Sequence, residues 1–77
     1  MKGIRPVTGY LLGAMGNGLL AARERAGLTQ YQVPGISQAA ISRWERGIRT
    51  PRVVDLVVLA RAYGLEPAEL LQMMLEA

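Results

Sequence analysis

The stretch Ser37–Gly47, which reads SQAAISRWERG, decides the fold that this sequence predicts. Ser37 is a favourable N-cap, because its hydroxyl can accept hydrogen bonds from the free N–H groups of a first helical turn. Gly47 suits the left-handed position that follows a last helical turn. The stretch therefore predicts a short helix over residues 38–46, with a defined start and a defined end.

The two faces of this expected helix differ in chemistry. Ile41 and Trp44 are three residues apart and share one face, which we expect to be buried. A glutamine amide can pair with adenine, an arginine can fork onto guanine, and an alanine methyl can contact the thymine methyl. The opposite face, which carries Gln38, Ala39, Ser42, Arg43 and Arg46, therefore has the chemistry of a helix that lies in the major groove of DNA. A solvated surface helix would carry arginines as well, so the helix alone leaves both interpretations open.

Composition narrows the classes of function. The 77 residues are enough for one small domain, and they include neither cysteine nor histidine. The commonest general base and the commonest metal ligands are therefore missing, and the only lysine is Lys2. We expect no enzyme, no metal site and no cofactor. No apolar run reaches the roughly 18–20 residues of a membrane span, and no signal peptide is recognisable, so a cytoplasmic location is expected by default.

The net charge of +3 is unevenly distributed. Four of the nine basic residues lie within residues 43–52, against one glutamate. Residues 53–77 carry one arginine against four acidic residues. Segregated basic charge at the end of the central helix indicates a polyanionic partner.

The first part of the chain is the least regular. Pro6 and five glycines among the first eighteen residues argue against one long helix there. The first clear helix is predicted over residues 17–26, with Asn17 as its cap and Gly27 after its end. Residues 1–15 are then an N-terminal extension, either a frayed end or a basic arm that reaches the DNA backbone.

The rest of the chain predicts three further helical elements. Thr29 caps a brief turn of helix, which Pro34 keeps short. Thr50 and Pro51 are typical of the start of a helix. That helix has one apolar stripe at three- and four-residue spacing, ends at Gly64, and is followed by a last helix that begins at Glu66-Pro67. The stripe, expected to be buried, consists of Val53, Leu56, Leu59, Ala60 and Tyr63.

Six further apolar residues on these last two helices have two interpretations. They complete a small core, or they form the contact between two copies of the chain. These dimer candidates are Val54, Val57, Val58, Leu71, Met74 and Leu75.

Residues 16–71 resemble the phage-repressor/Cro-type (XRE-like) helix-turn-helix family. The matching pieces stand in the family's order and are RERAGLTQ at 23–30, ISQAAISRWERG at 36–47, Pro51, LARAYGL at 59–65 and ELL at 69–71. The resemblance implies an all-α fold, a small five-helix bundle like the lambda-repressor DNA-binding domain, over residues 16–77. Only six residues separate Gln30 from Ser37 where the family usually has about nine, so nearly one turn of about 3.6 residues is missing and the second helix is expected to be shortened.

The resemblance also implies roles for individual residues. Gln30 contacts a phosphate and can brace Gln38. The spacing of Trp44 from Ile41, rather than the resemblance, predicts that Trp44 belongs to the core and not to a stacking surface. Arg23 and Glu45 match a pair that forms an interhelical ion pair in some members of the family. The expected base contacts are Gln38, Ala39, Ser42 and Arg43, and the expected phosphate contacts are Gln30, Ser37, Arg46, Arg49 and Arg52.

These observations predict a sequence-specific transcriptional regulator of repressor-like type, which binds double-stranded DNA as a homodimer. The alternative is an antitoxin-type or protein-interaction module, in which the apolar C-terminal helices hold a partner such as a toxin. A toxin-like reading frame beside the gene would favour this alternative.

Overall fold

The computed structural model describes residues 7–76, which form helices and connecting turns with no strand among them. The expected basic arm includes residues 1–6, which lie outside the described residues. The elements in chain order are α1 (Val7–Arg25), the short 3-10 turn η1 (Gln30–Gln32), α2 (Gln38–Glu45), α3 (Val53–Ala62) and α4 (Pro67–Glu76).

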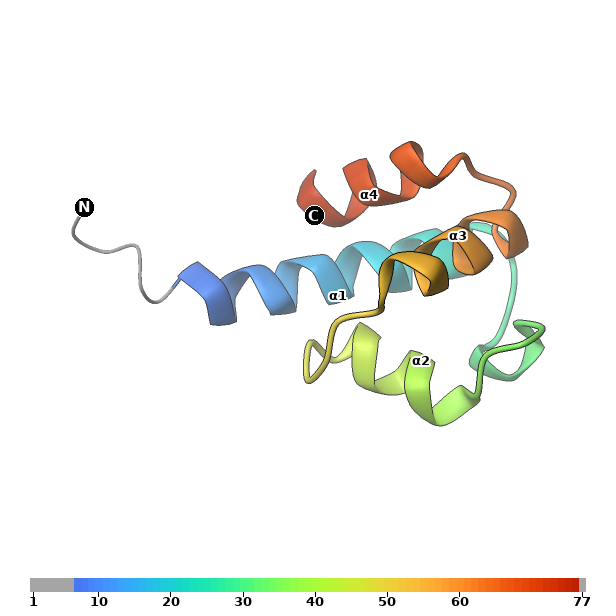
Figure 1. Ribbon diagram of the computed structural model, residues 1–77, viewed down its shortest axis with the longest axis horizontal. Coiled ribbons are helices and arrows are strands. Elements are labelled where there is room, and N and C mark those ends of the chain that lie inside the picture. The colour runs from blue at the N-terminus through green and yellow to red at the C-terminus, as the bar shows by residue number, and fades with distance from the viewer. Residues whose placement is uncertain (1–6, 77) are drawn as a thin grey trace.

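The long helix α1 is the centre of the arrangement, with α4 on one side of it and α2 on the other (Figure 1). The helix α3 packs against α4, and η1 packs against α2. All of these elements contribute to one apolar core apart from η1, which has no buried residue. The buried core side chains are Leu19, Ala22, Val33, Ile41, Leu59, Ala60, Tyr63, Leu70 and Met74.

The predicted start of the first helix at Asn17 is wrong, because α1 already begins at Val7 and continues through the boundary expected between residues 15 and 16. Two of its glycines lie where other helices approach most closely. A Cβ atom on Gly16 would lie 2.8 Å from the carbonyl oxygen of Trp44, and one on Gly18 would lie 2.5 Å from that of Met73. These glycines therefore mark close helix contacts rather than breaks in the helix.

The start and the end predicted for the central helix are both present. The Ser37 hydroxyl accepts a hydrogen bond of 3.1 Å from the N–H of Ala40. Gly47 adopts a left-handed φ of +73°, one residue beyond Arg46, the C-terminal cap. The helix α2 thus ends one residue earlier than predicted.

The second helical element is a single turn, in agreement with the expected shortening. The side-chain oxygen of Gln32 accepts the N–H of Thr29 at 2.8 Å and closes this turn. Residues 7–76 therefore contain four α-helices rather than five, and η1 occupies the place of the second helix in the chain order.

The helix α3 begins later than the sequence predicts. Its N-cap is Arg52 rather than Thr50, because the Asp55 carboxylate accepts the N–H of Arg52 at 3.0 Å. Val53 is 78% exposed, so its place in the buried stripe is also wrong. The end at Gly64, with a φ of +72°, and the start of α4 at Pro67 agree with the prediction.

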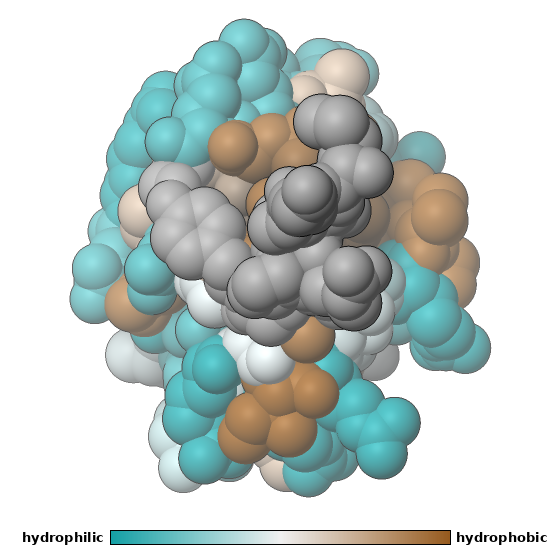
Figure 2. All heavy atoms as spheres, turned by 90° about the vertical axis from the view of Figure 1, so that its left-hand side faces the viewer, coloured by the Kyte–Doolittle hydropathy of each residue, from teal (hydrophilic) through white to brown (hydrophobic). Residues whose placement is uncertain are grey.

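The six dimer candidates divide between core and surface. Met74 is completely buried within the chain, so its prediction as a contact between copies is wrong. Figure 2 shows apolar side chains at several places on the end of the molecule facing the viewer, with hydrophilic side chains beside them. Of the other dimer candidates, Val57 and Val58 are half-buried, and Val54, Leu71 and Leu75 are exposed.

None of the helices between residues 7 and 76 combines the length and the apolar character that a membrane span requires.

Candidate nucleic-acid interface

The helix α2 is held in the fold by one face and presents the other to solvent. Ile41 and Glu45 are buried on the inner face. Arg43 and Ala39 are exposed, and they belong to the outer face. The side chains that the sequence assigns to base contact are thus accessible on one element, with Gln38 and Ser42 half-buried beside them.

A chain of hydrogen bonds fixes the first residue of α2 to α1. Two atoms of the Arg23 guanidinium donate to the Glu45 carboxylate, Nε at 2.7 Å and Nη2 at 3.0 Å. Glu45 also accepts the amide of Gln30 at 2.9 Å, and Gln30 in turn accepts the amide of Gln38 at 2.7 Å. The third guanidinium nitrogen of Arg23 donates to the carbonyl oxygen of Leu28 at 2.8 Å. This network, defined by Arg23, Glu45, Gln30 and Gln38, orients the Gln38 amide.

The network leaves Gln38 able to bind a base. A glutamine amide has two N–H donors and one acceptor oxygen. One N–H is used by Gln30, and neither the other N–H nor the oxygen has a hydrogen bond within the part of the chain that the structure describes. These are the two groups that a bidentate contact to adenine requires.

The hydrogen bonds to Glu45 also raise the pKa of Arg23 above its ordinary value, so this cation is permanently charged.

A second ion pair, which the sequence analysis missed, lies at the start of α3. The Arg52 guanidinium donates to both oxygens of Asp55, from Nε at 3.0 Å and from Nη2 at 3.1 Å. Asp55 is only 8% exposed, whereas the side chain of Arg52 is largely exposed. The signal in the sequence is an acidic residue three positions after a helix cap, where its carboxylate can reach back to the cap. Arg52, which the sequence analysis expects to contact a phosphate, is therefore already paired with the carboxylate of Asp55.

This ion pair predicts a pH dependence. The hydrogen bonds from Arg52 hold the pKa of Asp55 below the ordinary value of 3.8. The charged carboxylate therefore stabilises the fold above that value, and this contribution is lost as the pH falls through the lower pKa of the folded state. We expect Asp55→Asn to lower the melting temperature at pH 7, and the difference from the unchanged protein to shrink below about pH 4. Thermal unfolding followed by circular dichroism between pH 7 and pH 2 measures this difference in melting temperature. A constant difference across that range would contradict the pairing of Asp55 with Arg52.

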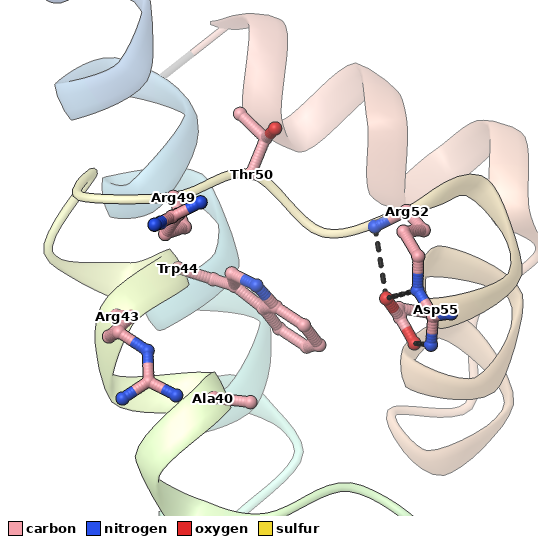
Figure 3. Close-up of a pocket in the computed structure, with 7 residues that line it drawn as sticks. All are labelled: Ala40, Arg43, Trp44, Arg49, Thr50, Arg52 and Asp55. Atoms are coloured by element: carbon pink, nitrogen blue, oxygen red, sulfur yellow. Dashed lines mark hydrogen bonds and ion pairs between the residues drawn. The ribbon is translucent and has the colours of Figure 1, made fainter.

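An open hollow of about 540 Å³ lies between α2 and α3 (Figure 3). The indole of Trp44 projects across it from α2 toward α3, and Trp44, which is partly buried, also packs against the core. Trp44 is thus only partly the core residue that the sequence predicts. The lining residues are Ala40, Arg43, Trp44, Arg49, Thr50, Arg52 and Asp55.

Comparison with known proteins agrees with this geometry. A family model described as a helix-turn-helix domain matches residues 14–73, which include part of α1, all of η1, α2 and α3, and most of α4. The chain belongs to the helix-turn-helix family. It is 41% identical over 59 residues to the uncharacterized HTH-type transcriptional regulator y4dJ of Sinorhizobium fredii, an alignment that covers 73% of this chain and 77% of that protein. No solved structure gives a significant match.

In this helix-turn-helix domain, the expected phosphate contacts surround the outer face of α2. Arg46 is exposed, and its Nε donates to the carbonyl oxygen of Ser42 at 3.3 Å. Arg49 is exposed on the loop after α2. Ser37 and Gln30 stand at the other end of α2, where the first is the N-cap and the second is half-buried in the network. The structure thus brings all of these groups to α2 and its two flanking turns.

Proposed function

We propose that this helix-turn-helix domain is a sequence-specific DNA-binding transcriptional regulator that acts as a repressor. The observation that carries the proposal is the outer face of α2, where Ala39 and Arg43 are accessible while a half-buried network fixes the Gln38 amide beside them. A helix of this kind fits the major groove, where each base pair shows a distinct pattern of donors, acceptors and methyl groups. Repression follows when an occupied operator excludes other proteins from the same DNA.

Two groups of side chains have different tasks in this proposal. Contacts to phosphates fix the register on the duplex and give most of the affinity, whereas contacts to base edges give the sequence preference. Gln38 pairs with adenine, Arg43 with guanine, and Ala39 and Ser42 fit the neighbouring base edges. The phosphate group comprises Gln30, Ser37, Arg46, Arg49 and Arg52.

Selection from random duplex DNA by the purified protein tests the proposed function. The expected result is a defined consensus, and a symmetric consensus would also give the spacing of two half-sites on a dimer. With about four phosphate neutralisations per copy, log K should fall with log salt at a slope of about −3 to −4. Equal, weak binding of the selected and the random duplexes would contradict sequence-specific recognition.

The variant Arg43→Ala tests whether this arginine reads a base. We expect a loss of about 1–3 kcal/mol in binding free energy and a relaxed preference at one base position, because a guanine loses its bidentate partner. The matched control is Arg61→Ala, which removes the same charge from an exposed position on α3 and should leave the preference unchanged. Fluorescence anisotropy with the consensus and its single-base variants measures both. An unchanged preference in Arg43→Ala would exclude Arg43 as a reader.

The surface of α3 and α4 is available for contact with a second copy of the chain or with a partner protein. Val54 on α3 and Leu71 and Leu75 on α4 are exposed, and Val57 and Val58 are half-buried. We propose that these five residues form the contact of a homodimer on DNA, and an antitoxin-type module that holds a toxin remains the alternative. An asymmetric single-site consensus, together with a monomeric mass for the DNA-bound protein by native mass spectrometry, would contradict the dimer.

A further inference from the structure

Thr50 has a hydroxyl group that the fold does not use. Local preference makes this threonine the cap of α3, but the carboxylate of Asp55 caps that helix at Arg52 instead. Thr50 is exposed in the connection between α2 and α3, and its hydroxyl makes no hydrogen bond within residues 7–76 as the structure describes them. An alcohol on an exposed segment outside the helices is accessible to a modifying enzyme.

The surroundings of Thr50 attract a doubly charged anion. Thr50 lines the hollow of about 540 Å³ together with Arg43, Arg49, Arg52 and Asp55, and three guanidinium groups against one carboxylate leave a net charge of +2 there. A phosphothreonine carries about −1.5 to −2 charges near pH 7 and has three acceptor oxygens. A phosphate group on Thr50 therefore neutralises the charge around the hollow.

The neighbouring arginines have donors for such a phosphate. Arg52 gives Nε and Nη2 to Asp55, and its Nη1 makes no hydrogen bond within the described part of the chain. The side chain of Arg49 is exposed and makes none there either. Figure 3 shows Thr50 on the loop between these two arginines, so a phosphate on its hydroxyl lies within reach of both long side chains. Guanidinium donors and phosphate oxygens form strong, charge-assisted hydrogen bonds.

We propose that Thr50 is a phosphorylation site, and that its phosphate, held by Arg49 and Arg52, releases the protein from DNA. A serine/threonine protein kinase carries out the transfer with ATP as the donor. The bond between the γ-phosphorus of ATP and the bridging oxygen breaks, and a bond from that phosphorus to Oγ1 of Thr50 forms. ADP leaves, and the hydroxyl proton passes to the base of the kinase. This inference rests on the proposed function, to which it adds a means of regulation.

Release follows because the phosphothreonine occupies side chains that we propose for the DNA backbone. Arg49 and Arg52 are two of about four phosphate contacts, and each hydrogen bond to a charged group contributes at least about tenfold to affinity. Their loss should weaken duplex binding about a hundredfold and reduce the salt slope to about −1 to −2. The new negative charge also repels the DNA phosphates, which acts in the same direction.

The full chain with phosphothreonine at position 50, prepared by chemical synthesis, tests the switch. Anisotropy of the selected duplex should show binding about a hundredfold weaker than that of the synthetic unmodified chain. Phosphorus NMR of the protein alone should place the second pKa of the phosphate below its ordinary value of about 6, because two guanidinium groups favour the dianion. Unchanged affinity would overturn the switch, and an unshifted pKa would overturn the binding of the phosphate by the arginines.

Variants separate the position of the charge from the charge itself. Thr50→Glu adds one negative charge, and we expect it to weaken duplex binding about tenfold. The control Ala68→Glu adds the same charge at an exposed position on α4 and should weaken binding less than about twofold, since a charge far from the DNA acts only through steering. Equal losses in the two variants would contradict a local effect at Thr50. Thermal unfolding checks that each variant is folded.

The modification itself is tested by incubating the purified protein with γ-labelled ATP and an extract of the cells that produce it. We expect label in the unchanged protein and none in Thr50→Val, which keeps the shape of the side chain without its hydroxyl. No label in the unchanged protein, or equal label in both, would overturn Thr50 as the site. If the unmodified protein bound no duplex even at low salt, the proposed function would fail, and the labelling and the NMR titration would still decide whether Thr50 is modified and its phosphate held.

Discussion

Gly16→Ala is expected to lower the free energy of unfolding by about 3 kcal/mol or more. The new methyl group would meet the backbone carbonyl oxygens of Glu45 and Trp44, at the end of α2. Because those atoms belong to backbone rather than to a flexible side chain, α1 and α2 must move apart. Thermal and urea-induced unfolding measure the loss, which corresponds to a decrease in melting temperature on the order of 15 °C for a domain of this size.

The chain offers a matched control on the same helix. Gly13→Ala adds the same methyl group where no heavy atom from outside its own stretch of helix lies within 4 Å, so it should stabilise the protein by up to about 1 kcal/mol through the higher helix propensity of alanine. Gly18→Ala, whose methyl group would meet the backbone of Met73 and Met74, should behave like Gly16→Ala. Similar stabilities for all three variants would contradict the close packing of α1.

The contrast among these glycines explains why α1 is longer than the sequence predicts. A glycine lowers helix propensity by about 1 kcal/mol wherever it stands, and sequence reasoning sees only this cost. At Gly16 and Gly18 the cost is offset by two helices that approach the backbone of α1. Which glycines have such neighbours depends on residues about 28 and 55 positions away, and local sequence carries no information about them.

The segment Ser37–Gly47 was predictable because its signals are local. The Ser37 cap, the buried Ile41 and the left-handed Gly47 act within the segment itself. The start of α3 was not, because local preference favours a cap at Thr50 over a cap at Arg52. The carboxylate of Asp55 decides between them by reaching back to the Arg52 N–H. The same pairing made Asp55 part of the candidate site, whereas its charge alone suggests an ordinary surface residue.

Glu45→Gln is expected to lower the free energy of unfolding by about 3–5 kcal/mol, the range for removal of one partner of a buried ion pair. The side chains of Arg23 and Glu45 are only 11% and 5% exposed, so the guanidinium would remain buried without a counter-ion. The carboxylate accepts three hydrogen bonds, one of them from Gln30, and a glutamine offers one acceptor oxygen in its place. Urea-induced unfolding measures the loss.

The control for this variant is Glu24→Gln, which removes the same charge from an exposed neighbour on α1. A surface substitution of this kind should change the stability by no more than about 0.5 kcal/mol. Equal effects of the two substitutions would show that net charge, and not the buried pair, determines the result. This comparison concerns stability alone. The effect of the network on the orientation of Gln38 must be measured in a variant that stays folded.

The double variant Arg23→Met and Glu45→Leu separates orientation from stability. It removes both buried charges. Replacing a buried ion pair by apolar side chains recovers much of the stability that is lost when only one partner is removed. The hydrogen bond from Arg23 to the Leu28 carbonyl oxygen is still lost. Gln30 then loses its partner on Glu45, and the Gln38 amide is no longer held from α1. We therefore expect a folded protein that still binds DNA in a salt-dependent manner but prefers adenine less at the position that we propose Gln38 to read. If the double variant kept its full preference at every position, the network would serve stability alone, and the geometry of α2 would be sufficient for recognition without it.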